Sequence, residues 1–284
     1  MSAKSTFLPV ETMLQSKGKL LDLSQPVVMG ILNATPDSFY NKGRENSISD
    51  LLKKAEKMLK DGAVVLDIGG ASTKPGAVII DFEKELERVV PVIENIHQRF
   101  PEAWLSVDTY HAKVATEAVN VGASIVNDVS SGQIDNEMLN TVARLKVPYI
   151  AMHLQGTPET MQQNPVYEDV VFEVRDYLRR KCDEAMKVGI NDIIIDPGFG
   201  FGKTLEHNIA LLQSLHSFRM LGRPVLVGLS RKSIVCKTLG ITPDEALNGT
   251  TAYHLLALQQ GANMLRVHDV KEAVETVKIW QQMS

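Results

Sequence analysis

The stretch Gly62-Ala63-Val64-Val65-Leu66-Asp67-Ile68-Gly69-Gly70 contains the structural unit from which the rest of the chain is built. Gly62 ends a segment in which apolar residues recur at helical spacing from Leu51 to Leu59, as a C-terminal glycine cap does. Val64–Ile68 is a short apolar run rich in β-branched residues, which is typical of a parallel strand buried on both faces. The stretch therefore predicts a helix followed by a buried parallel strand.

Seven further runs of this kind occur along the chain, each bounded by polar residues or glycine. They are Val27–Leu32, Trp104–Val107, Ser124–Val126, Pro148–Met152, Ile193–Ile195, Pro224–Leu229 and Asn263–Val267. Helical spacing lies between the runs, and Gly122, Gly189 and Gly261 precede strands as Gly62 does. Eight strand–helix alternations predict a parallel sheet, and eight strands close a (β/α)8 TIM barrel. An open doubly wound sheet is the alternative, although it usually has about five to seven strands.

Two local patterns refine this α/β prediction. Thr242-Pro243-Asp244-Glu245 has the pattern of a capping box with proline at the first helical position, and predicts a helix that runs to Gln260. Met13-Leu14-Gln15 and Lys19-Leu20-Leu21 flank Ser16-Lys17-Gly18, which predicts a short N-terminal β-hairpin at the barrel floor.

No sequence repeat, low-complexity segment or long linker divides the chain. We therefore expect an N-terminal segment with the hairpin over residues 1–23 and a single barrel domain over residues 24–284.

The composition argues against several classes of protein. Of the 284 residues, 44% are hydrophobic, and 30 Lys+Arg against 34 Asp+Glu give a net charge of −4 without a long basic block. This charge argues against nucleic acid or an anionic membrane as the main partner. The longest apolar stretch is far shorter than the roughly 18–20 residues that cross a bilayer, and the first residues lack the apolar core of a secretory signal. Cys182 and Cys236 form no CxxC pair. We expect a cytoplasmic protein.

Active sites of TIM barrels lie on the loops that follow the strands. Polar residues follow all eight predicted strands, and this convergence is the strongest argument from the residues alone for an enzyme. The segments are Asn33–Phe39, Asp67–Gly76, Asp108-Thr109, Asn127-Asp128, Met152-His153, Asp196–Lys203, Ser230–Ser233 and Arg266–Asp269.

The side chains in these segments form two chemical groups. Asp108, Asn127, Asp196 and Lys232 could bind a flat heterocycle at its edge, because carboxylates accept paired N–H donors and lysine donates to a ring oxygen or nitrogen. The second group has cationic or hydrogen-bonding ends that suit a phosphate or a Mg²⁺-bound phosphate. It consists of Asn33, Thr73, Lys74, Arg266 and His268.

Each candidate also has a purely structural interpretation. Pro197–Lys203 fails both the P-loop and the GxGxxG pattern, and is more often a tight turn than a phosphate cradle. Asp108 could cap a helix, and Asp37 could shape a turn. The seven histidines show no HExxH motif or close pairing, which argues against a zinc site, and there is no GxSxG elbow.

Eight motifs, taken in order, carry a resemblance to a known family. They are Gly30–Asn33 with Thr35–Phe39, Asp67–Gly70 with Ser72–Gly76, Ser106–Thr109, Asn127-Asp128, Met152-His153 with Gly156–Pro158, Asp196–Lys203, Ser230–Ser233 and Arg266–Asp269. In this order they resemble the dihydropteroate synthases of folate biosynthesis, over roughly residues 19 to 270. The resemblance implies a transferase that joins 6-hydroxymethyl-7,8-dihydropterin pyrophosphate to 4-aminobenzoate and releases pyrophosphate. It also implies Mg²⁺, a homodimer and a sulfonamide target.

The resemblance also assigns roles to individual residues. Asp108, Asn127, Asp196 and Lys232 would hold the pterin, with Met152 beside the ring, and the catalytic set would be Asp108, Lys232, Arg266 and His268. Asn33 would be the ligand of Mg²⁺ on the pyrophosphate, which Thr73, Lys74, Arg266 and His268 would contact. The 4-aminobenzoate pocket would be formed by Phe39, Thr73, Pro75, Phe201, Lys232 and Ser233.

The sequence departs from the family pattern in its first two loops. Lys74 stands where arginine is usual, Ala71 where glutamate is usual, and Asn41-Lys42 where Asp-Gly is usual. Pterin binding is therefore indicated more strongly than full turnover or ordinary sulfonamide sensitivity. Two alternatives stay open at this point: a pterin-dependent methyltransferase with a corrinoid partner, and a non-catalytic pterin-binding paralogue.

Overall fold

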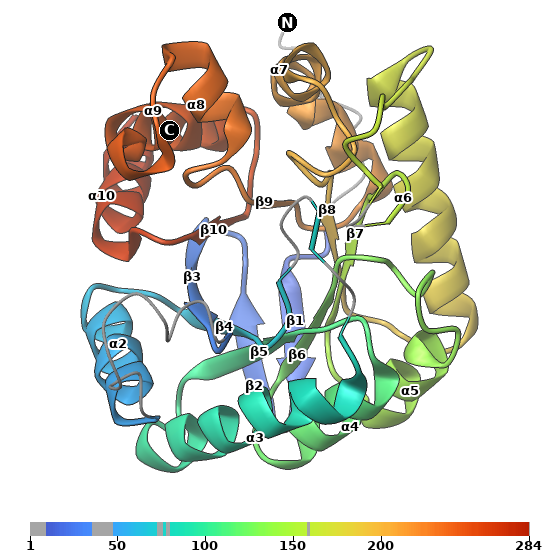
Figure 1. Ribbon diagram of the computed structural model, residues 1–284, viewed down its shortest axis with the longest axis vertical. Coiled ribbons are helices and arrows are strands. Elements are labelled where there is room, and N and C mark those ends of the chain that lie inside the picture. Colours follow the sequence, from blue (N-terminus) through green and yellow to red (C-terminus); the bar gives the residue numbers. More distant parts are fainter. Residues whose placement is uncertain (1–9, 36–47, 73–75, 78–79, 158–159, 284) are drawn as a thin grey trace, which may run out of the picture.

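A computed structural model describes residues 10–35, 48–72, 76–77, 80–157 and 160–283. Its core is a parallel eight-stranded sheet that curves into a barrel (Figure 1). The strands are β3 (Val27–Asn33), β4 (Val65–Gly69), β5 (Trp104–Asp108), β6 (Ile125–Asp128), β7 (Tyr149–Met152), β8 (Ile193–Asp196), β9 (Leu226–Val227) and β10 (Met264–Val267). Their order is β8-β7-β6-β5-β4-β3-β10-β9, and a parallel bridge between Ile195 and Val225 joins the two edges. Every predicted run falls on a strand, so the predicted TIM barrel is confirmed.

Helices surround the barrel and pack their apolar faces on it (Figure 1). They are α2 (Ile48–Lys60), α3 (Phe82–Arg99), α4 (Ala112–Asn120), α5 (Met138–Leu145), α6 (Val170–Lys187), α7 (Leu205–Gln213), α8 (Ser233–Leu239), α9 (Leu247–Gln259) and α10 (Val270–Gln281), with 3-10 helices η1 (Leu215–Leu221) and η2 (Pro243–Glu245). Gly62 follows α2 with a φ of +104°, the left-handed conformation that a glycine cap adopts. Within the described part of the chain, no helix is long and apolar enough to span a bilayer.

The predicted capping box is present, but the helix it was expected to begin is interrupted. Thr242 and Glu245 exchange the two capping contacts, and the chain then forms only the short 3-10 helix η2. The α-helix α9 starts after Ala246 and ends at Gln259. The predicted continuous helix from this box to Gln260 is therefore wrong in its first turn. The carbonyl of Pro243 accepts from the backbone N–H of Ala246, as in a 3-10 turn, and Nη1 of Arg231 donates to the carbonyls of both Pro243 and Asp244.

A hairpin closes the amino end of the barrel. Strands β1 (Met13–Ser16) and β2 (Lys19–Asp22) pair antiparallel, with Leu14 opposite Leu21. Leu14, Leu21 and Leu23 are buried in one apolar cluster with a side chain from every barrel strand: Met29, Val65, Trp104, Ile125, Ile150, Ile194, Leu226 and Met264. The predicted hairpin at the barrel floor is confirmed, and the opposite, carboxyl end is left to carry the polar loops.

Candidate active site

The carboxyl ends of the strands bring buried polar side chains together at one level of the barrel. Asp108 pairs with Asn127 across β5 and β6, and Met152 pairs with Asp196 across β7 and β8. Asp67, on β4, is fully buried, and Asp108, Asn127 and Asp196 are at most 8% exposed. Charged groups are seldom buried this far unless they are paired or bind a ligand.

Arg266, on β10, connects two of these carboxylates. Its Nε donates to Oδ2 of Asp67 and its Nη2 donates to Oδ2 of Asp108, both at 2.6 Å. Nδ2 of Asn127 donates to the same Asp67 oxygen at 3.1 Å. Sequence reasoning quoted Asp67 in a motif but gave it no role. The available signal was a carboxylate inside an otherwise apolar strand.

Two buried carboxylate oxygens in this group have no hydrogen-bond partner among the described residues. They are Oδ1 of Asp67 and Oδ1 of Asp108. Burial raises the pKa of Asp108 to about 7. The positive charge of Arg266 opposes this shift, and the negative charges of Asp67 and Asp128 add to it. An unpaired buried acceptor costs free energy, so both oxygens suit a ligand that presents N–H groups.

Asp196 and Lys232 lie within electrostatic reach of each other. Burial raises the pKa of Asp196, and the positive charge of Lys232 opposes that shift. Burial lowers the pKa of Lys232 to about 8, opposed by Asp196. Nζ of Lys232 donates to the carbonyl of Phe199 at 2.6 Å and lies 4.5 Å from the ring centre of Phe201. Lys232, Asp196 and the ring of Phe201 therefore form one wall of the candidate site, which has a charged part and an apolar part.

Met152 lies in an apolar cluster beside this wall. It is 3% exposed and packs with Tyr110, Val129, Leu154 and Met161, and Phe201 packs against the same cluster. The structure thus brings Met152 next to the aromatic side chain that sequence reasoning placed in the second substrate pocket. The partner of Asn127 in its motif, Asp128, instead accepts hydrogen bonds from Ser130, Gly132 and Tyr149, which gives it a structural role.

The loops after β9 and β10 are joined to each other. Oγ of Ser230 lies 3.1 Å from Nδ1 of His268 and accepts from the backbone N–H of that residue. His268 is exposed to solvent. Ser233 is exposed at the start of α8. Both side chains are open to an incoming ligand.

Arg231, between Ser230 and Lys232, pairs with a carboxylate on the loop after β10. Its Nε and Nη2 donate to the two oxygens of Asp269 at 2.8 and 2.9 Å. Its backbone has a φ of +56°, which is uncommon for a residue other than glycine. The guanidinium of Arg231 is therefore used to hold the loop after β10.

The remaining predicted residues belong to the first two loops. Asn33 ends β3 beside Gly69 of β4, and its amide makes no hydrogen bond to the described residues. Phe39, Thr73, Lys74 and Pro75 lie outside the described residues. In the described part of the chain, no group of three or more His, Cys, Asp or Glu residues could hold a metal ion.

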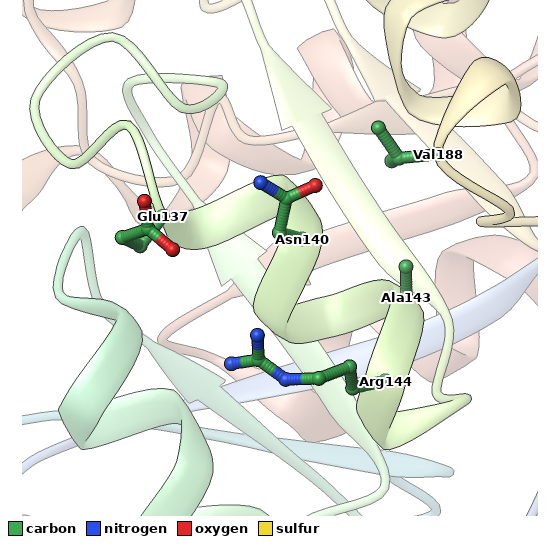
Figure 2. A pocket seen from close by; sticks show the side chains of 5 residues that line it. All are labelled: Glu137, Asn140, Ala143, Arg144 and Val188. Carbon is green, nitrogen blue, oxygen red and sulfur yellow. The ribbon is translucent and has the colours of Figure 1, made fainter.

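A separate hollow lies on the outer surface of the barrel, at α5 and the end of α6 (Figure 2). It is lined by Glu137, Asn140, Ala143, Arg144 and Val188, none of which is a predicted site residue. The polar convergence at the carboxyl ends of the strands is the candidate active site.

Comparison with known proteins gives the class. The family model described as pterin binding enzyme matches residues 29–268. The dihydropteroate synthase of Haemophilus influenzae is 46% identical over 270 residues, which cover 94% of this chain and 98% of that protein. That of Escherichia coli strain K12 is 46% identical over 266 residues, covering 93% and 94%.

Solved structures agree with the sequence comparison. A Yersinia pestis dihydropteroate synthase in a sulfonamide drug complex matches with a TM-score of 0.91 and 44% identity, over 95% of this chain and 98% of that one. A Xanthomonas albilineans dihydropteroate synthase with 4-aminobenzoic acid matches with a TM-score of 0.90 and 41% identity, over 96% and 98%. The chain therefore belongs to the pterin-binding enzymes and, within them, to the dihydropteroate synthase family. The predicted family and the predicted enzyme class, a transferase, are confirmed.

Proposed function

We propose that this chain joins 6-hydroxymethyl-7,8-dihydropterin pyrophosphate to 4-aminobenzoate, giving 7,8-dihydropteroate and pyrophosphate. The observation that carries the proposal is the set of buried acceptors at the carboxyl ends of the strands, two of whose oxygens have no partner among the described residues. A Xanthomonas albilineans relative is described in complex with 7,8-dihydropteroate, at 39% identity and a TM-score of 0.86.

The pterin ring is the ligand that these acceptors fit. Its amino and ring N–H groups would donate to Asp108 and Asp196, and Lys232 would donate to a ring oxygen or nitrogen. Asn127 is held in place by Asp67, and Met152 supplies an apolar contact beside the ring. The carboxylates would also stabilise positive charge that develops on the pterin when the C–O bond to pyrophosphate breaks.

The departing pyrophosphate needs its growing negative charge neutralised. Arg266 and Lys74 are the residues we assign to this task, with His268 and Thr73 as hydrogen-bond donors to the phosphate oxygens. Asn33 offers a neutral amide oxygen free of other described contacts, which fits a Mg²⁺ ion held mainly by phosphate oxygens. Bound there, Mg²⁺ would supply further charge neutralisation to the leaving group.

The second substrate then forms the new bond. The amine of 4-aminobenzoate attacks the electrophilic pterin carbon, a C–N bond replaces the C–O bond, and the proton that the amine loses leaves with the departing pyrophosphate. Phe201, Ser233 and the stem of Lys232 would form this pocket together with Phe39, Thr73 and Pro75. Water must be kept out because it would capture the same cation.

Three further assignments stay predictions for this chain: a Mg²⁺ requirement, a homodimeric assembly and a cytoplasmic location. A response to sulfonamides is expected in kind, because such drugs would compete for the 4-aminobenzoate pocket. Its strength depends on the first two loops, where Ala71, Lys74 and Asn41-Lys42 depart from the family pattern.

The test is pyrophosphate release from the pterin substrate, measured before and after 4-aminobenzoate is added. We expect release that depends on 4-aminobenzoate, with 7,8-dihydropteroate formed in equal amount. Pterin binding without release would support the non-catalytic paralogue instead. Methyl transfer from methyltetrahydrofolate to a corrinoid would support the methyltransferase.

The metal assignment has a separate test. Calorimetry should show that Mg²⁺ tightens the binding of pyrophosphate and leaves the binding of a bare pterin unchanged, because Asn33 alone is a weak ligand. Tight binding of Mg²⁺ in the absence of any phosphate would contradict the assignment.

A further inference from the structure

The loop between β8 and α7 is held by side chains at every carbonyl from residue 198 to residue 202. Nζ of Lys203 donates to the carbonyls of Gly198 and Phe201, and Nζ of Lys232 donates to that of Phe199. The carbonyls of Gly200 and Gly202 accept from Gln162 and Tyr167, respectively. A surface loop usually leaves many of these groups to water, so this loop is built to stay in one conformation.

Lys203 is the residue that organises the loop from inside. It is 3% exposed, and its Nζ lies 2.9 Å from the carbonyl oxygen of Gly198, from that of Phe201 and from Nδ1 of His153. Nζ therefore has three acceptors at this distance, as many as an ammonium group has N–H donors. Burial keeps the pKa of His153 far below its ordinary value, so this ring stays neutral and its Nδ1 can accept.

Close packing explains why the loop depends on this lysine. The left-handed Gly198 lies against the carbonyl of His153, where an added Cβ would stand 2.0 Å from the oxygen. The carbonyl oxygen of His153 thus packs on the Cα of Gly198, and Nζ of Lys203 contacts the carbonyl oxygens of both residues, that of His153 at 3.4 Å. Removing Nζ would take a hydrogen-bond donor away from both carbonyl oxygens in a buried space.

The same loop forms one wall of the candidate active site. Lys203 holds the carbonyls of residues 198 and 201, and the carbonyl of Phe199 accepts from Lys232. The ring of Phe201 lies beside the Lys232 ammonium. We propose that Lys203 is a positioning residue for the reaction, which fixes Lys232 and Phe201 in place through the loop and does not touch substrate. This inference rests on the function proposed above.

The experiment compares three variants of the full chain. Lys203→Met keeps the length of the side chain and removes all three donors, while Lys203→Gln keeps an amide with two N–H groups. Lys187→Met, at the exposed end of α6, removes a surface lysine as the matched control. Each variant is assayed for its KM for 4-aminobenzoate, and for cleavage by chymotrypsin after Phe199 and Phe201 far below its unfolding temperature.

We expect Lys203→Met to raise the KM for 4-aminobenzoate roughly tenfold or more, because small displacements of positioned groups have effects of this size. We also expect chymotrypsin to cut its loop after Phe199 or Phe201, with Lys203→Gln intermediate and Lys187→Met like the wild type. A purely stabilising lysine would lower the unfolding temperature without opening this one segment to protease.

A wild-type KM together with an uncut loop in Lys203→Met would overturn the inference. If that variant does not fold, Lys203→Gln decides: a raised KM with cleavage supports the role, and wild-type behaviour on both counts refutes it. If the wild-type protein itself releases no pyrophosphate, the proposed function fails, while the chymotrypsin comparison still tests whether Lys203 holds the loop.

Discussion

Arg266 sets the charge balance of the pocket at the scale of single residues. Burial lowers its pKa, but the carboxylates of Asp67 and Asp108 more than compensate and keep it charged. With a pKa near 7 for Asp108, the pocket changes its number of acceptors in the physiological pH range. The ligand affinity of this site should therefore fall as the pH is lowered through 7, because protonation converts an acceptor into a donor.

Asp196→Asn tests the acceptor role directly. Oδ1 of Asp196 accepts from the backbone N–H of Gly198 at 2.7 Å, so an asparagine would keep its oxygen there and turn its NH₂ toward the ligand. A donor would then face the donors of the pterin, and calorimetry should show a loss of about 1–3 kcal/mol in binding. Asp183→Asn, on the outer helix α6, is the control. Unchanged affinity in Asp196→Asn would remove this residue from the pocket.

Glu85→Gln tests a buried acid outside the pocket. Glu85 lies fully buried on α3, and burial raises its pKa to about 8. Between about pH 4.5 and pH 8, Glu85 therefore keeps its proton in the folded protein and loses it in the unfolded chain. The free energy of unfolding falls as the pH rises through this range. Relative to the wild type, Glu85→Gln should gain stability over this range, on the order of 1 kcal/mol per pH unit.

Urea unfolding at several pH values measures this difference, and Glu87→Gln, an exposed change on the same helix, is the control. A difference between Glu85→Gln and the wild type that stays constant from pH 5 to pH 8 would contradict the raised pKa. The test needs no ligand, so it stands apart from the functional assignments.

At the scale of elements, two connections hold the rim of the barrel together. The loop after β9 contacts the loop after β10 through Ser230 with His268 and through Arg231 with Asp269. Arg231 also reaches the carbonyls of η2, so one guanidinium ties three segments. Lys232, Ser233 and His268 thus take their positions from a shared support.

Asp269→Asn should loosen that support. The pair with Arg231 is three-quarters buried or more, so breaking it should cost about 2 kcal/mol of unfolding free energy and lower the rate of pyrophosphate release. Asp183→Asn breaks the more exposed pair with Arg179, and should change the unfolding free energy by less than about 0.5 kcal/mol. Equal effects of the two changes in urea unfolding would show that the rim pair is no more than a surface contact.

Local sequence predicted the elements well and their connections poorly. Val64–Ile68 and its seven counterparts fell on strands because burial on both faces selects a continuous apolar run. Such a run can be recognised from a few neighbouring residues alone. The turn before α9 is contacted by Arg231, which lies 12 residues from Pro243 in sequence, and a local pattern does not contain such a contact. The pairing of Asp67 with Arg266 spans 199 residues, and only the closed barrel brings them together.

At the scale of the whole molecule, the barrel keeps stability and chemistry at opposite ends. Leu14 is 1% exposed within the floor cluster, so Leu14→Ala should cost about 2–5 kcal/mol and lower the melting temperature by several degrees. Leu20→Ala, at a position 65% exposed on the same hairpin, should change little. Pterin affinity should be unaltered in both variants when it is measured below their melting temperatures; a loss in Leu14→Ala would show that the two ends are coupled.

The filled floor has a consequence for the traffic of molecules through the enzyme. Side chains from the hairpin and from every strand fill the amino end of the barrel, so a ligand reaches the buried acceptors from the carboxyl end. The acceptors are buried at the carboxyl ends of the strands, whereas Ser233 and His268 are exposed on the loops that follow β9 and β10. A molecule held by the buried acceptors must therefore bind first and dissociate last. A molecule bound at the exposed residues keeps it in the site. An inhibitor bound at these exposed residues would then slow the dissociation of a bound pterin and also compete with 4-aminobenzoate.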